Sequence, residues 1–146
     1  MKNQFELQAI KLREINFRLD DESPPQEVHR GGFSIDLKAA PREGDGRQVR
    51  VTMRVHTVGE GFPFSLDVAV SGYFAFLRAP EKEEMRTFLD TYAKHILLPY
   101  AREAVSNLMA RSGMPPVYLP LVLGEPEADW NQGRYVLPGG MPSGTA

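Results

Sequence analysis

Residues that commonly bind metal ions are few in this sequence and are not spaced for that task. His29, His56 and His95 are far apart, and none belongs to an HxH, HxxxH or HExxH pattern that would place two ligands on one element. The acidic residues 20–22 carry enough charge for a hard cation, but an acidic run followed by prolines is more typical of a solvated loop. We therefore expect no metal site.

Catalytic nucleophiles and phosphate-binding loops are not indicated either. The sequence contains no cysteine, which excludes thiol nucleophiles, thiolate metal sites and disulfides. Ser65, Ser71 and Ser106 lack a nucleophile-elbow context, and no glycine-rich loop joins a predicted strand to a predicted helix. Because no convergent set of polar residues marks a small-molecule pocket, we predict a protein that is not an enzyme and uses no cofactor.

The composition indicates one globular domain of moderate charge. A chain of 146 residues, 42% hydrophobic and 25% charged, has room for one core. Its net charge of −2 provides no positive field for a phosphate backbone, so we expect no nucleic-acid partner. Glu6, Gln8 and Lys11 interrupt the apolar residues of the N-terminus, and no stretch reaches the roughly 18 apolar residues of a membrane span. We expect a cytoplasmic protein without direct membrane insertion.

The first half of the chain alternates between apolar and polar residues, which predicts β-strands. In the first strand the alternation changes phase after Ala9 and again after Leu12, as expected for a long strand whose bulges turn it toward different neighbours. The expected strands cover residues 5–19, 33–39, 49–55 and 64–70. The apolar segment 73–77 follows, and its two apolar faces imply cover from another subunit or a ligand.

From Pro80 onward the period of the apolar residues becomes helical. One helix is expected to begin near Pro80 and to break or kink at Pro99. A second is expected over residues 100–111, ending at Gly113. Strands followed by helices predict an α+β domain over residues 1–123, and the Gly- and Pro-rich residues 124–146 are expected to form a loop and a mobile tail.

A set of aromatic and branched apolar residues lies outside the regular core pattern. Most residues of this type are buried in a core or a subunit interface, which is the simpler interpretation. The second interpretation is that a small sheet with one helical layer cannot bury both strand faces and the apolar loop 117–123, which leaves apolar surface for partners. The set comprises Phe62, Phe64, Tyr73, Phe74, Phe76, Tyr118, Leu119, Leu121 and Val122.

Three segments of this sequence resemble the SecB family of export chaperones. The most specific is ILLPYAREAVSNLMARSGMPPVYLPLV, residues 96–122, with its Pro-Tyr-Ala-Arg-Glu core. FELQAIKLREINF is similar to the first strand of that family, and GEGFPFSLDVAVSGYFAF is similar to its third-to-fourth strand hairpin. Together these segments span roughly residues 5–122.

The resemblance implies a four-stranded antiparallel sheet with helices packed on one side, assembled as a homotetramer that is a dimer of dimers. It also implies a molecular chaperone that needs no nucleotide, binds unfolded precursor proteins in apolar grooves and keeps them export-competent. The apolar set above would line the groove. The helix would contribute subunit contacts through Leu97, Ala101, Val105 and Leu108.

The SecA motor is a further partner that the resemblance implies. Glu14 and Asp67 match acidic positions at which family members dock to SecA, whereas Arg18 stands where an acid is usual. The family's second helix is replaced here by a segment with too much Gly and Pro for a stable helix. We therefore expect weak SecA binding. A chaperone dedicated to a single partner, such as an antitoxin, is the alternative function.

Overall fold

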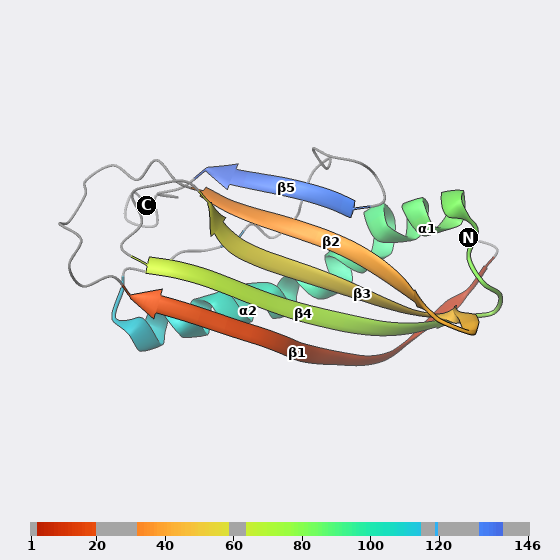
Figure 1. Cartoon of the computed structure of the whole chain (residues 1–146), viewed down its shortest axis with the longest axis horizontal. Helices are drawn as coiled ribbons and strands as arrows, with labels where there is room; N and C mark the ends of the chain where they lie inside the picture. The colour runs from red at the N-terminus through yellow and green to blue at the C-terminus, as the bar shows by residue number, and fades with distance from the viewer. Residues whose placement is uncertain (1–2, 20–31, 59–63, 115–118, 120–131, 139–146) are drawn as a thin grey trace.

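The alternating segments of the sequence form one antiparallel sheet (Figure 1). The computed structural model describes residues 3–19, 32–58, 64–114, 119 and 132–138. Its strands are β1 (Phe5–Leu19), β2 (Gly32–Arg42), β3 (Asp45–Val58), β4 (Phe64–Phe76) and β5 (Gln132–Pro138). They lie in the order β1-β4-β3-β2-β5, and every neighbouring pair is antiparallel. The four predicted strands are confirmed, each with the same or wider boundaries.

β1 keeps its apolar residues on one face by means of two bulges. Its pairing with β4 shifts register between Leu7 and Ala9 and again between Leu12 and Glu14. The bulges are thus confirmed, but they serve one neighbour rather than several, because residues that lie opposite each other in an antiparallel pair share a face. Without the first bulge, the two-residue period would turn Ile10 and Leu12 to the other face. The residues that lie opposite the even-numbered, helix-facing positions of β4 are Phe5, Leu7, Ile10, Leu12, Ile15, Phe17 and Leu19.

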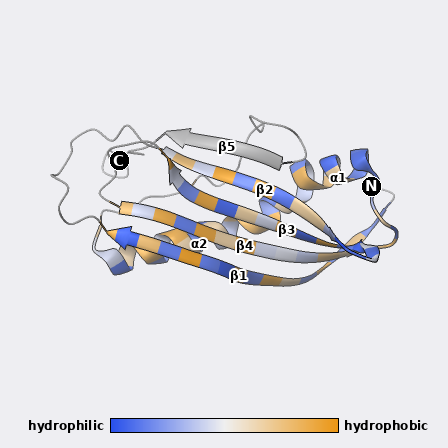
Figure 2. Cartoon of the chain, viewed as in Figure 1, coloured by the Kyte–Doolittle hydropathy of each residue, from blue (hydrophilic) through white to orange (hydrophobic). Residues whose placement is uncertain are grey.

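The helices cover that same face of the sheet, where the core lies. α1 (Lys82–Phe88), a π-helical turn η1 (Leu89–Ala93) and α2 (Lys94–Ser112) follow β4, and α2 contacts β1, β3 and β4. Phe88, Leu97 and Ala101 are fully buried against apolar residues of β2, β3 and β4. The colouring in Figure 2 shows the alternation along the strands that separates this apolar face from the polar one. The α+β arrangement with helices on one side is confirmed.

The predicted break at Pro99 does not occur, because Pro99 lies inside α2. Proline cannot donate the backbone hydrogen bond of its position. Leu97, Leu98 and Ala101 on either side of it are fully buried, however, and their packing holds the helix together. The irregular turn lies earlier, at η1, and the helix ends at Gly113 with a φ of 77°, as predicted. No helix in the described part of the chain is long and apolar enough to cross a membrane.

Gly72 of β4 lets α2 approach the sheet closely. A Cβ atom at this position would lie 2.8 Å from the ring of Phe74 and 3.0 Å from the side chain of Leu97. Both atoms belong to fully buried core residues, which have little room to move. Only a residue without a side chain therefore fits between β4 and α2 at this point.

β5 lies in the segment for which the sequence analysis expected a loop and a mobile tail. It pairs with β2 from Gly32 opposite Pro138 to Lys38 opposite Gln132. Gly and Pro disfavour a helix, but a short edge strand tolerates Pro at its end because only one side of the strand is paired. The sheet thus has five strands, one more than predicted. The remainder of 124–146 lies outside the described residues.

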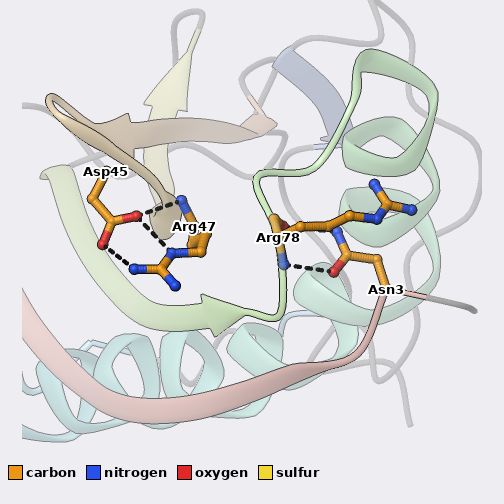
Figure 3. Close-up of polar contacts among 4 residues, drawn as sticks. All are labelled: Asn3, Asp45, Arg47 and Arg78. Carbon is orange, nitrogen blue, oxygen red and sulfur yellow. Dashed lines mark hydrogen bonds and ion pairs between the residues drawn. The ribbon is translucent and has the colours of Figure 1, made fainter.

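Side-chain hydrogen bonds stabilise the β2–β3 hairpin and the segment that precedes β1 (Figure 3). The Asn3 side-chain amide donates a hydrogen bond to the Arg78 carbonyl at 2.9 Å, and the Arg78 backbone N–H donates to Asn3 Oδ1 at 3.2 Å. In the hairpin, Arg47 Nε donates to Asp45 Oδ1 at 3.0 Å, and hydrogen bonds from Arg47 lower the pKa of Asp45. The buried Asn3 thus ties the residues before β1 to the residues after β4.

Candidate functional site

Exposed apolar residues are concentrated along β1. Four of the six large hydrophobic residues that are exposed in the described part of the chain belong to this strand: Leu7, Leu12, Ile15 and Leu19. β1 is also an edge strand, and no described strand pairs with its outer side. Its free N–H and C=O groups are therefore available to another extended chain. Contiguous apolar surface at an unpaired edge is a mark of an interaction site.

A groove of about 420 Å³ lies between β1 and α2. Its apolar lining comprises Ile10, Leu12 and Ile15 of β1, Val70 of β4, and Tyr100, Ala104 and Leu108 of α2. The α2 residues are spaced four apart and so lie on one side of the helix. The β1 residues reach the same groove because the second bulge restores their facing. We call this feature the apolar groove.

The apolar groove and the free edge of β1 together suit a polypeptide in extended conformation. Apolar pockets bury side chains, while an unpaired strand edge supplies main-chain hydrogen bonds that do not depend on sequence. Leu12 and Ile15 are 55% and 46% exposed, so the described chain leaves about half of each side chain in water. A partner that covers them gains hydrophobic free energy.

Several predicted client-binding residues are buried in the single chain. Phe64, Phe74 and Phe76 lie on the helix side of β4 with exposed fractions of 7% or less. Phe74 and Phe76 each pack edge-on against Phe88, with ring centroids 4.9 Å apart. Tyr73 lies on the opposite face of the sheet. The structure therefore does not gather these residues on one surface.

The apolar loop after α2 is described at one residue. Leu119 is buried, and its backbone carbonyl accepts a hydrogen bond from Arg102 Nε at 2.9 Å. This contact ties Leu119 to α2. The predicted client contacts outside the described residues are Phe62, Tyr118, Leu121 and Val122.

The helical stripe predicted to make subunit contacts is largely part of the chain's own core. Leu97, Ala101 and Val105 have no exposed surface, because α2 packs this stripe on the sheet. Leu108 is partly buried and lines the apolar groove. Tyr100, which was not predicted as a site residue, is 48% exposed at the groove. Its spacing of four from Ala104 was the available signal.

The acids predicted to dock SecA share one arginine on the sheet face away from the helices. Arg54 Nη2 donates to Glu14 Oε1 at 3.0 Å, and Arg54 Nη1 donates to Asp67 Oδ1 at 2.6 Å. The hydrogen bonds that Arg54 donates, first to Glu14 and then to Asp67, raise the pKa of Arg54. The structure thus brings both acids together and offsets part of their charge. Arg54 could not be predicted from the sequence, because only the register of β3 places it beside the two acids.

The described histidines do not form a ligand set. His56 Nδ1 lies 3.7 Å from Asp36 Oδ2, and His95 Nδ1 lies 3.2 Å from the Thr91 carbonyl. Within residues 3–19, 32–58, 64–114, 119 and 132–138, no group of three or more His, Cys, Asp or Glu side chains is placed to hold a metal ion. His29 lies outside these ranges.

Comparisons with known proteins agree with the sequence-based resemblance. A family model described as preprotein translocase subunit SecB matches residues 2–123. The protein-export protein SecB of Pseudomonas syringae pv. tomato is 34% identical over 122 residues, which cover 80% of this chain and 73% of that protein. The protein-export protein SecB of Methylococcus capsulatus is 26% identical over 135 residues, which cover 81% and 78%.

A solved structure shares the fold. The SecB-like chaperone of Mycobacterium tuberculosis, in complex with a peptide from an antitoxin, matches with a TM-score of 0.63 at 20% sequence identity. The match covers 81% of this chain and 87% of that one. The family model ends before β5, so the additional strand lies beyond the matched residues.

Proposed function

The chain belongs to the SecB family, and we propose that it acts in the cytoplasm as a chaperone that binds unfolded polypeptides without nucleotide and keeps precursor proteins export-competent. The match to the SecB family carries the holding function in this proposal, and the apolar surface that one chain leaves uncovered along β1 and the apolar groove carries its assembly. Burying a large apolar side chain contributes roughly 1.5–3 kcal/mol. A few such contacts support binding without demanding a particular sequence.

A second copy of the chain covers the β1 edge in this proposal. Pairing through β1 and the apolar groove buries Leu12 and Ile15 of each copy and satisfies free main-chain groups of the edge. The resulting dimer is the unit from which the homotetramer, a dimer of dimers, is built. Residues Leu97, Ala101 and Val105 support this contact indirectly, by holding α2 on the sheet.

Clients bind the apolar loop that follows α2. Leu119 anchors that loop through its buried side chain and the hydrogen bond from Arg102. Phe64, Phe74, Phe76 and Leu119 are buried, and Tyr73 lies on the sheet face away from the helices. The proposed client contacts therefore narrow to Phe62, Tyr118, Leu121 and Val122.

The test compares two leucines of the same loop, using suppression of aggregation of a chemically denatured protein. Leu121→Ser should weaken suppression while the melting temperature stays unchanged. Leu119→Ser should instead lower the melting temperature, because it removes a buried core contact. If Leu121→Ser leaves suppression intact in a folded protein, clients bind elsewhere.

Light scattering of the wild-type protein, with and without the denatured client, tests assembly in the same experiment. The proposal expects a tetramer that gains the mass of the client. A monomer at micromolar concentration would refute the assembly, and a tetramer that never gains mass would refute the holding function.

We propose that the protein binds SecA only weakly. Arg54 pairs with Glu14 and Asp67, and Arg18 adds an exposed positive charge to the same face. A basic partner surface therefore meets little net negative charge, and repulsion at a rim lowers the rate of association.

A chaperone dedicated to one client is the second candidate. The Mycobacterium tuberculosis protein that shares this fold was solved in complex with an antitoxin peptide. A panel of unrelated denatured proteins separates the two candidates. Equal protection of the whole panel supports the general export chaperone, whereas protection of a single protein supports the dedicated one.

A further inference from the structure

Three cations surround Tyr73 on the sheet face away from the helices. Arg13 Nη1 donates a hydrogen bond to the Tyr73 hydroxyl at 3.1 Å, and Lys11 Nζ lies 5.1 Å from the centroid of the ring. Arg50 lies directly opposite Tyr73 in the β3–β4 ladder. The Arg13 hydrogen bond lowers the pKa of Tyr73, and the charges of all three cations act in the same direction. We call these four residues the basic cluster.

The cations of the basic cluster form no ion pairs in the part of the chain that the structure describes. None of Lys11, Arg13 and Arg50 forms an ion pair with a described carboxylate. On the same face, Glu6 lies opposite Ala75, two residues along β4 from Tyr73, and the acids farther along, Glu14 and Asp67, are both bound to Arg54. With Glu6 counted, the three cations of the cluster still leave an excess of positive charge on this part of the face.

A groove of about 470 Å³ adjoins the basic cluster. Tyr73 and Arg50 line it, together with Gln8, Gln48 and Arg42. The arginines carry N–H donors only, and the glutamine amides offer both donors and acceptors. The lining therefore provides charge for carboxylates and amides for peptide groups, on the face opposite the apolar groove.

We propose that the basic cluster and its adjoining groove dock an extended, carboxylate-rich segment of a partner protein. The guanidinium groups of Arg13 and Arg50 match the planar geometry of carboxylates. The net charge of the whole chain is −2, so attraction of an anion depends on the local cluster rather than on the overall field. A nucleic-acid backbone, with its dense phosphates, would demand a longer track of cations than this cluster supplies.

This inference goes beyond the holding of unfolded clients and beyond docking of a basic partner at Glu14 and Asp67. The sheet face away from the helices carries two patches that would bind partners of opposite charge. Arg54 and Arg18 balance the charges of Glu14 and Asp67, whereas the basic cluster is free to attract an acidic segment. An acidic partner can thus bind while the β1 edge remains in the subunit contact.

Fluorescence anisotropy with a Glu-rich peptide and its Glu-to-Gln counterpart tests the proposal. The full-length protein should bind the Glu-rich peptide with an affinity that falls as salt rises, and the counterpart should not bind. The triple variant Lys11→Gln, Arg13→Gln, Arg50→Gln should lose at least about tenfold in affinity. Equal binding of both peptides would overturn the proposal.

A matched control separates the local cluster from general electrostatics. Lys82→Gln, Arg86→Gln and Arg111→Gln together remove the same charge from the helices, and affinity should stay within about twofold. An equal loss in both triple variants would overturn the proposal. The proposal would also be overturned if a single-stranded oligonucleotide bound more tightly than the peptide and the cluster variant lost that binding.

Folding of the cluster variant is checked by its circular dichroism melt. If the triple variant does not fold, the single charge reversal Arg50→Glu at an exposed site replaces it, and the same loss of affinity for the Glu-rich peptide is expected. A folded Arg50→Glu protein with unchanged affinity would overturn the proposal.

Discussion

Along β4, the even-numbered residues from Phe64 to Phe76 face the helices and are buried, whereas the odd-numbered residues face away and include Asp67 and Tyr73. The helix side is apolar and continuous with α2. The other side carries the ion pairs of Arg54 and the basic cluster. Apolar burial stabilises a fold without selecting partners, while exposed charges contribute at most about 1 kcal/mol per pair but select partners by sign. Substitutions on the two faces should therefore differ in kind.

β1 exposes apolar side chains on its helix side and charged side chains on its other side. Its helix-side residues continue the core, yet Leu12 and Ile15 remain half exposed because no described strand lies beyond them. Its other side supplies Lys11, Arg13 and Glu14 to the charged face. Apolar contacts on one side and charges on the other can thus be altered separately in the same strand.

The largest effect is expected for a charge in the helix-side core. Val105 is fully buried in α2, so Val105→Asp leaves an unpaired carboxylate in the core and should lower the free energy of unfolding by at least about 3 kcal/mol. Urea denaturation measures this. The exposed neighbour Ser106→Asp should change it by no more than about 0.5 kcal/mol. Similar curves for both variants would place Val105 at a solvent-facing position.

A smaller loss is expected where α2 approaches β4. Gly72→Ala places a Cβ atom 2.8 Å from the Phe74 ring and should destabilise the protein by about 1–3 kcal/mol. Ala75→Ser, on the partly exposed opposite face, should stay within about 0.5 kcal/mol. Thermal or urea unfolding measures both, and an unaffected Gly72→Ala protein would mean that helix and strand are farther apart.

The uncovered part of the helix side should affect assembly more than folding. Leu12→Ser combined with Ile15→Ser should raise the dissociation constant between copies at least about a hundredfold, because apolar contacts are lost on both partners. The melting temperature measured at a concentration where the wild type is monomeric should change little. Sedimentation gives the mass. Leu77→Ser, an exposed residue that does not line the apolar groove, is the control and should leave the mass unchanged.

The smallest effect on stability, and the clearest effect on partners, is expected on the charged face. Arg54→Gln frees Glu14 and Asp67 and should change the free energy of unfolding by less than about 1 kcal/mol, since all three side chains are partly exposed. Binding to SecA should tighten and become more sensitive to salt. Arg18→Glu should act in the same direction. Weaker SecA binding by both variants would show that SecA does not use this face.

The periodicity of the sequence determined the strands, the two bulges of β1, the helical region and the end of α2 at Gly113, and its motifs indicated the SecB family. These features depend on residues that are close in the sequence, and the strand period of two residues and the helix period of 3.6 residues reveal them directly. The same local reasoning did not predict that α2 continues through Pro99 or that β5 forms. Buried packing sustains α2 across the proline, and pairing with β2 orders a Gly- and Pro-containing strand.

Only the tertiary structure decided which apolar residues are buried in the chain's own core and which polar side chains contact one another. Ala101 and Val105 were equally suited to a subunit contact or to the core, and the packing of α2 on its own sheet assigns them to the core. Arg54 reaches Glu14 across 40 positions of sequence, and Arg13 reaches Tyr73 across 60. Such contacts follow from strand order and register, because antiparallel pairing places distant residues side by side and no local pattern encodes their distance.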